Sequence, residues 1–290
     1  MDANNLLKSL KLIPMECDLA DLSSVDKFVA NLKKGGASFD AVCYNAGLSR
    51  NTEAKDVART AQGFELTVGT NHLGHFYLNH LLMPLINKDT GRIVVTASSV
   101  HDPDSPGGAA PPSSSPATLG DLKGWEEAVA NGSRQFDMVD GSAEYDPYKA
   151  YEDSKLCNVI FTRELQRRLD ATGSNIKVNS FTPGLIVGTG LFRDQNKVFT
   201  KVFDIAATNL LKVGETPHYG GGALEYMALS SKVGEKGGLY YYSAPGSSKY
   251  GDDAYGKQFD VREVSREARE SDDSGKAKRF WELSEKLVGI

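Results

Sequence analysis

The sequence of 290 residues has few cysteines, no long apolar run and no excess of basic residues. Its three cysteines, Cys17, Cys43 and Cys157, have neither metal-ligand nor disulfide spacing, so we expect reduced thiols and no metal site. No apolar run approaches the roughly 18 residues that a membrane-spanning helix needs. The first residues, MDANNLLKSLKLIPMECDL, resemble neither a signal peptide nor a transit peptide, and we expect no targeting peptide in this chain.

The charge balance of the chain argues against nucleic acid as a partner. Lys and Arg number 33 against 38 Asp and Glu, which gives a formal net charge of −5. No local run of basic residues offsets this balance, so nucleic acid is not an expected partner. A composition of 40% hydrophobic and 24% charged residues is that of a soluble globular protein with a substantial core.

Short apolar runs alternate with longer segments of helical period, which is the pattern of a parallel sheet with crossover helices. The run GRIVVTASSV is almost continuously apolar and β-branched, as expected of a strand buried on both faces. We therefore predict an α/β fold, a Rossmann-like doubly wound parallel sheet in a single domain over residues 1–290. The predicted strands are 10–19, 39–47, 91–100, 175–184 and one near 240; the predicted helices are 23–34, opened by a serine cap, 62–87, one that carries residue 151, and 279–290.

Residues 101–148 interrupt this alternation with many Pro, Gly and Ser residues and a polar continuation. A connection of this length inside a compact domain is usually functional or disordered. We interpret it as an insertion, and composition leaves two readings open: a lid over a site, or a surface loop. A second polar stretch begins at 246 and leads into the C-terminal helix, so we treat 246–290 as a C-terminal polar segment and helix.

The stretch AYEDSKLCN places Tyr151 and Lys155 four residues apart, so that both side chains would share one face of a helix. A phenol has an ordinary pKa near 10 and becomes a useful acid near neutral pH when a neighbouring ammonium stabilises its phenolate. The pair by itself is equally consistent with an ordinary helix surface. Its interpretation depends on what lies around it.

Polar and special residues stand at the carboxyl ends of the predicted strands, where open parallel sheets bind their ligands. They are Asp18, the Asn45-Ala46-Gly47 turn, the serines 98 and 99, and the Pro183-Gly184 turn. A serine hydroxyl, a phenol and a lysine that converge there form a proton-transfer set. The phenol would transfer the proton, the lysine would lower its pKa, and the hydroxyl would orient the substrate.

Five features in this order and spacing resemble the short-chain dehydrogenase/reductase family: NAG at 45–47, TNHLGHF at 70–76, the strand end at Ser99, Tyr151-x-x-x-Lys155, and the PG turn at 183. The resemblance implies that Tyr151 is the catalytic acid, Lys155 its partner and a nicotinamide-ribose ligand, Ser99 the substrate-orienting hydroxyl, and Asn71 the residue that ties the lysine to a proton-relay water. It also implies a cofactor site, with Asp18 at the adenine, Asn45, Ala46 and Gly47 at the adenosine ribose, the Pro183-Gly184 turn beside them, and Thr189 at the nicotinamide amide.

Further segments narrow the resemblance: SPATLGDLKG, FDMVDG, KAYEDSKLCN, GTGLFR and WELSEKLVG are similar to those of light-dependent protochlorophyllide oxidoreductases. This implies NADPH as cofactor, a tetrapyrrole pigment as substrate, and light-triggered reduction of the ring D double bond. Residues 101–148 would be the lid over the pigment. It also implies a plastid, or the cytoplasm of a cyanobacterium. An exposed apolar lid would allow peripheral membrane association, and a homo-oligomer is left open.

Two departures from the family are visible. Its glycine-rich TGxxxGxG turn, which holds the pyrophosphate, has no counterpart before the first predicted strand, so we expect the first βαβ unit to be missing. The Gly220-Gly221-Gly222 run lies too late in the chain to replace it. Where the light-dependent enzymes have YPGC, this sequence has a leucine at the last position, Leu185, which cannot donate a hydrogen bond as a thiol does.

These departures leave two alternatives to a protochlorophyllide reductase: a light-independent short-chain dehydrogenase/reductase for another hydrophobic carbonyl or alcohol, and a non-catalytic pigment- or partner-binding remnant. Three residues are candidate substrate contacts, namely His101, Leu185 and Arg193. For His101 and Arg193 the alternatives are the start of a loop and a surface charge. His72 and His75 lack a third ligand at a useful spacing and are expected to pack within a helix face.

Overall fold

The computed structural model describes residues 11–109, 115–186, 189–194, 214–251 and 259–290. At its centre is a five-stranded sheet whose order follows the chain, β1-β2-β3-β4-β5. The strands β1 to β4 are parallel, and β5 pairs antiparallel with β4. The predicted α/β fold with a mainly parallel sheet is confirmed. The strands are β1 (Ala41–Tyr44), β2 (Arg92–Thr96), β3 (Lys177–Thr182), β4 (Tyr240–Ser243) and β5 (Phe259–Arg262).

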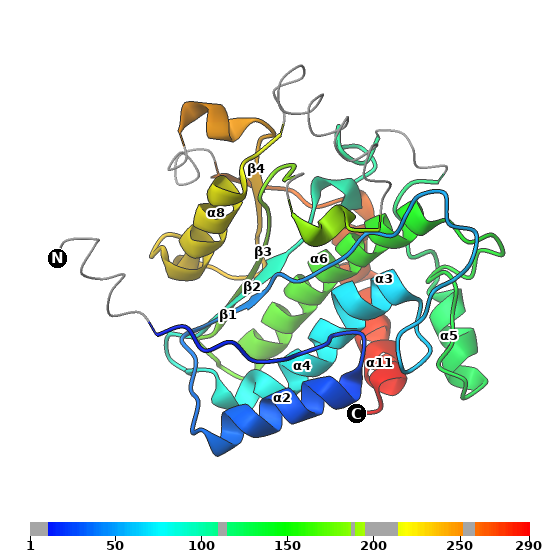
Figure 1. Cartoon of the computed structure of the whole chain (residues 1–290), viewed down its shortest axis with the longest axis horizontal. Coiled ribbons are helices and arrows are strands. Elements are labelled where there is room, and N and C mark those ends of the chain that lie inside the picture. Colours follow the sequence, from blue (N-terminus) through cyan, green and yellow to red (C-terminus); the bar gives the residue numbers. More distant parts are fainter. Residues whose placement is uncertain (1–10, 110–114, 187–188, 195–213, 252–258) are drawn as a thin grey trace.

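Helices cover both faces of the sheet (Figure 1). On one face Ile93 and Val95 of β2 join the larger apolar core, and on the other Val94 packs with Phe181 and helix α8. This double burial is why β2 is apolar at consecutive positions rather than at alternate ones. The helices are α2 (Leu22–Lys34), α3 (Leu66–Val68), α4 (Gly74–Leu82), α5 (Lys123–Ala130), α6 (Pro147–Ala171), α8 (Pro217–Leu229), α10 (Arg266–Asp273) and α11 (Lys276–Val288).

The helix predicted over 62–87 is broken into shorter pieces. A π-helical turn, Gly69–Leu73, separates α3 from α4, and a 3₁₀ turn, Met83–Leu85, ends the segment. A π turn holds one extra residue and re-aims the side chains around it. Here it lies at Asn71, whose buried amide bonds the backbone of a neighbouring loop rather than its own helix. The periodic sequence pattern carries no trace of this local change.

The strand predicted over 10–19 is not present in its described part, because residues 11–18 form no regular element. Leu12 and Ile13 are 89% and 66% exposed, so their apolar character marks no core strand here. The helix that follows begins one residue earlier than expected. Its cap is Asp21, whose carboxylate accepts the N–H of Ser23 at 2.9 Å, and not a serine.

The insertion contains a packed unit rather than only loop. Trp125 of α5 is fully buried and stacks on Phe280 of α11 with ring centres 5.3 Å apart. Leu119, Leu122 and Phe136 join the same core. The polar composition of 101–148 concealed these anchors, which are few but widely spaced. In the described part of the chain, no helix is both long and apolar enough to cross a bilayer.

A buried ion-pair cluster attaches this unit to α6. The Lys149 ammonium lies 2.6 Å from a carboxylate oxygen of Asp153 and 3.1 Å from one of Asp140, and it donates to the carbonyl of Thr118 at 2.9 Å. Asp153 also accepts the Thr118 N–H at 2.9 Å. The two carboxylates raise the pKa of Lys149, whereas burial raises the pKa of Asp153. Charges inside a protein are tolerated when they are paired and hydrogen-bonded in this way.

Candidate active site

Helix α6 presents the predicted acid and its partner to the ends of the strands. Asp146 caps its N-terminus by accepting the N–H groups of Tyr148 and Lys149 at 2.9 and 3.0 Å. Proline at the next position has the backbone angle of a helix start. One turn further on, the ammonium of Lys155 lies 5.4 Å from the centre of the Tyr151 ring. The two side chains therefore meet as their spacing predicts.

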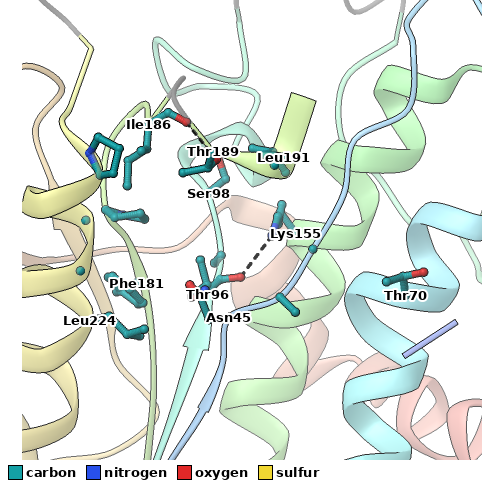
Figure 2. A pocket seen from close by; sticks show the side chains of 18 of the residues that line it. Asn45, Thr70, Thr96, Ser98, Lys155, Phe181, Ile186, Thr189, Leu191 and Leu224 are labelled. Carbon is teal, nitrogen blue, oxygen red and sulfur yellow. Dashed lines mark hydrogen bonds between the residues drawn. The ribbon is translucent and has the colours of Figure 1, made fainter. Parts of the chain in front are cut away.

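Lys155 is a buried ammonium with a single weak hydrogen bond among the described residues. It is 3% exposed and donates to the carbonyl of Thr96 at 3.3 Å (Figure 2). Burial lowers the pKa of Lys155 to about 8, so the group keeps its charge at neutral pH. A Cβ at Gly47 would lie 3.1 Å from the Asn71 side-chain oxygen and 3.7 Å from this nitrogen, so the turn after β1 packs close to both side chains. The site thus holds a positive charge that a ligand's hydroxyl groups or a phenolate can approach.

The serine that faces Tyr151 is Ser98 and not the predicted Ser99. Burial raises the pKa of Tyr151, and a hydrogen bond from Ser98 opposes that rise. Ser99 lies instead on a separate cavity of about 320 Å³ beside Tyr240 and Tyr242. Consecutive side chains of an extended chain point to opposite sides, and Ser98 has an extended backbone (φ −160°, ψ 154°).

The position of Thr96 in the structure accounts for which of the two serines faces the cavity. Thr96 and Ser98 are two residues apart, so they face the same side of the strand end. The Thr96 hydroxyl donates to the Asn45 side chain at 2.9 Å, which places that side at the ligand cavity. Ser98, two residues after Thr96, is therefore the serine on the side of the cavity.

Asn71 is fully buried and does not line the cavity. Its side-chain oxygen accepts the Leu48 N–H at 2.8 Å, and its nitrogen donates to the Leu48 carbonyl at 2.9 Å and to the Ser154 hydroxyl at 3.0 Å. The residue therefore fastens the turn after β1 to helix α6. The part in a proton relay that the family resemblance implied for Asn71 stays a prediction.

A cavity of about 640 Å³ joins these elements at the carboxyl ends of β1, β2 and β3. All the predicted cofactor residues line it: Asp18, Asn45, Ala46, Gly47, Tyr151, Lys155, Pro183, Gly184 and Thr189. Arg193 lines it too, and its part as a substrate contact stays a prediction. Sequence reasoning missed further lining residues, among them Cys17, Thr70, Phe181, Ile186, Leu191, Pro217, Gly220, Gly221 and Leu224.

Helix α8 forms one wall of this cavity, and the Gly220-Gly221-Gly222 run was its signal in the sequence. A Cβ at Gly220 would overlap Ile186, so the helix and the loop after β3 approach closely because this residue has no side chain. Figure 2 shows Phe181 and Leu224 on this side of the cavity, across from Lys155. The Ile186 side chain lies against Gly220, whereas Gly221 has open space where a Cβ would stand.

Two of the three candidate substrate residues do not line this cavity. His101 is 1% exposed and lies behind the strand end, near Tyr240. Leu185 is fixed by its backbone, which pairs with Gly214 and accepts the N–H of Glu215 at 2.7 Å. Neither position supports the direct substrate contact that we expected.

The two remaining histidines of interest are packed as predicted. The His72 ring stacks on Trp125 at 5.9 Å and lies 5.0 Å from Phe280, and burial lowers the pKa of His72 to about 3. The His75 Nδ1 bonds the Asn71 carbonyl at 3.0 Å. No group of three potential ligands that could hold a metal occurs among the described residues.

Comparison with known proteins gives two kinds of match. A family model described as "short chain dehydrogenase" matches residues 2–120. Among curated proteins, the chain is 36% identical over 280 residues to a chloroplastic protochlorophyllide reductase of Cucumis sativus, covering 95% of this chain and 65% of that protein. It is 34% identical over 282 residues to protochlorophyllide reductase A of Oryza sativa subsp. japonica, covering 95% and 67%. The chain thus spans about two thirds of the length of these relatives.

Among solved structures, an uncharacterised protein from Mycobacterium paratuberculosis is similar with a TM-score of 0.57 and 29% identity. The match covers 94% of this chain and 74% of that one. The structural similarity therefore extends over nearly all of the chain, including the elements that bring Tyr151, Lys155 and Ser98 together.

Proposed function

We propose that this chain, which belongs to the short-chain dehydrogenase/reductase family, reduces protochlorophyllide with NADPH in a light-driven reaction. That it is an oxidoreductase follows from the family; the substrate, the cofactor's phosphate and the need for light are the proposal. One observation carries it: Tyr151, Lys155 and Ser98 converge on a cavity lined by every strand-end residue expected to hold the cofactor. Like the relatives it resembles, it would act in a plastid, or in a cyanobacterial cytoplasm.

The residues present fit the nicotinamide half of the cofactor. The buried Lys155 ammonium has one bond of 3.3 Å and can donate further to ribose hydroxyls. Gly47 lines the same cavity, and so does Thr189, which lies beside Ile186 (Figure 2). When bound there, NADPH supplies a hydride.

The chain itself supplies the proton. Burial keeps Tyr151 in its phenol form, so its hydroxyl proton is available to the carbon that does not receive the hydride. As the phenolate develops, the nearby Lys155 charge and the Ser98 hydroxyl stabilise it in a site of low dielectric. The ring double bond thus gains one hydride and one proton, and the phenol is restored afterwards from solvent.

The apolar part of the cavity suits a wide, planar substrate. Phe181, Ile186, Leu191 and Leu224 line it, and Gly220 and Gly221 add no side chain of their own. Arg193 lies on the rim, where its guanidinium is available to a carboxylate of the pigment. These features support a tetrapyrrole with propionate groups as substrate.

An absorption spectrum tests the proposal directly. The chain is mixed with NADPH and protochlorophyllide in darkness and recorded again after one flash. We expect a shift to the chlorophyllide band that needs both light and NADPH. Turnover in the dark would favour the second candidate, a light-independent reductase for another hydrophobic carbonyl or alcohol. A pigment that binds without any conversion would favour a binding protein.

A pair of serine variants separates the two neighbouring hydroxyls. Ser98→Ala removes the donor that faces Tyr151, and we expect kcat to fall about 100-fold, the loss typical of one donor to a developing oxyanion. Ser99→Ala removes a hydroxyl on the other cavity and is the matched control, with kcat within about twofold. Steady-state kinetics give kcat of both variants and show which serine takes part in the reaction. A large loss in Ser99→Ala with none in Ser98→Ala would reverse the assignment.

A further inference from the structure

His101 is a buried residue that the proposed mechanism does not use, although it lies only three residues after Ser98. Both of its ring nitrogens are engaged. Nδ1 lies 2.7 Å from the carbonyl oxygen of Ser98, and the backbone N–H of Ser265 points at Nε2 from 3.3 Å. The ring edge also meets the face of Tyr240, with centres 4.8 Å apart at 70°.

These two partners fix the protonation of the ring. A backbone N–H can only donate, so Nε2 carries the lone pair, and a carbonyl can only accept, so Nδ1 carries the proton. His101 is thus neutral in a single tautomer, and burial lowers its pKa in agreement. The backbone N–H of His101 donates to the same Ser98 carbonyl at 3.2 Å, so this one oxygen is held from two directions.

The ring connects two parts of the fold that are distant in sequence. At one end is Ser98, which lines the same cavity as Tyr151 and whose hydroxyl accepts the Val100 N–H at 3.4 Å. At the other end is Ser265, which is 1% exposed and caps helix α10. Helix α10 packs on α6, the helix that carries Tyr151. The His101 ring therefore links the strand end at Ser98 to Ser265 at the start of α10. Because α10 packs on α6, this link leads back to the helix that carries Tyr151.

We propose that His101 is a positioning residue that aims the Ser98 hydroxyl at Tyr151 by holding the Ser98 carbonyl against the N-terminus of α10. The role of Ser98 in the reaction rests on the proposed function. A carbonyl held from two directions fixes the peptide after Ser98, and with it the direction of the Cα–Cβ bond. Displacements of about 1 Å at a reacting group can cost on the order of 100-fold in rate.

The first test replaces the imidazole. His101→Ala removes both hydrogen bonds, and we expect kcat to fall roughly 10- to 100-fold with little change in KM, because the substrate surface is intact. His101→Gln keeps one donor and one acceptor, and we expect it to recover part of the loss. If His101→Ala lowers thermal stability but keeps the wild-type kcat at a temperature where it is folded, the residue is merely structural and the proposal is overturned.

A second pair removes the other end of the connection without touching the histidine. Ser265 has φ −51°, an angle that proline adopts, so Ser265→Pro deletes the N–H that bonds Nε2. Ser265→Ala removes the capping hydroxyl but keeps that N–H, and it is the matched control. We expect kcat of Ser265→Pro to fall below that of Ser265→Ala. Equal kcat values would contradict the proposal.

A readout without turnover keeps this inference separate from the proposed function. Hydrogen exchange of the Val100 amide, which donates to the Ser98 hydroxyl, reports the orientation of Ser98 in the unliganded protein. We expect faster exchange in His101→Ala, and unchanged exchange would overturn the positioning role. If the wild type showed no reductase activity while this amide still responded, the proposed function would fail and the geometric inference would stand.

Discussion

Tyr151→Phe should lower kcat by about 100- to 10,000-fold, the range that general acid catalysis contributes. The substitution keeps the ring, and with it the contact to the Lys155 ammonium, but it removes the proton that the ring double bond must receive. Binding of the cofactor and pigment should change little, so KM should be nearly constant. Single-turnover spectroscopy after a flash measures the loss in the step itself.

A matched control for Tyr151→Phe is Tyr148→Phe, one turn earlier on α6 and outside the residues that line the cavity. It removes a phenol from the same helix and should keep kcat within about threefold of the wild type. Turnover of Tyr151→Phe at the wild-type rate would show that the proton comes from another group, and the acid assigned to this site would have to be replaced.

Lys149→Met should destabilise the protein by about 3–5 kcal/mol, because it leaves the buried Asp153 without its counter-charge. Urea unfolding of the variant at fixed pH gives the difference. Lys123→Met is the matched control: its ion pair with Glu127 is exposed on both sides, and its loss should cost less than about 0.5 kcal/mol. Equal losses in both variants would mean that burial does not strengthen the Lys149 cluster.

The deficit of Lys149→Met should depend on pH in a defined direction. Burial raises the pKa of Asp153, and removal of the ammonium raises it further. A carboxyl whose pKa is higher in the folded state than in the unfolded state binds its proton more tightly when folded, so the fold loses stability as the pH rises above the unfolded value, about 3.9. In the wild type burial already raises the pKa of Asp153 to about 8, so both proteins lose this stability equally as the pH rises toward that value, and the deficit should grow only above about pH 8. A second substitution, Asp153→Leu, should restore much of the stability above pH 8.

Strands β1 to β4 and the proximity of Tyr151 and Lys155 could be predicted because each rests on a short-range rule. Val94 and its neighbours are apolar on both faces of β2, and the spacing of Tyr151 and Lys155 is one turn of any helix. These signals need no knowledge of distant residues. The doubly wound sheet and the strand-end cavity follow from them.

Three further features could not be predicted because each depends on contacts between distant parts of the chain. The choice between Ser98 and Ser99 needed the register of β2 against its neighbours, which the paired serines alone do not reveal. Trp125 gave no periodic signal because it is buried against α11, more than 150 residues later. The π turn at Asn71 is stabilised by Leu48 on another loop. Contacts of this kind determine the local structure, and the composition of a segment does not indicate them.

Helix α6 carries the ion pair that holds the insertion on one side and the residues of the cavity on the other. Lys149 and Asp153 face the insertion, whereas Tyr151 and Lys155, each two residues further on, face the cavity. Two residues are about 200° around a helix, so the two pairs occupy opposite sides of one rigid rod. A change in the unit that packs on one side of the helix therefore need not turn the phenol on the other side.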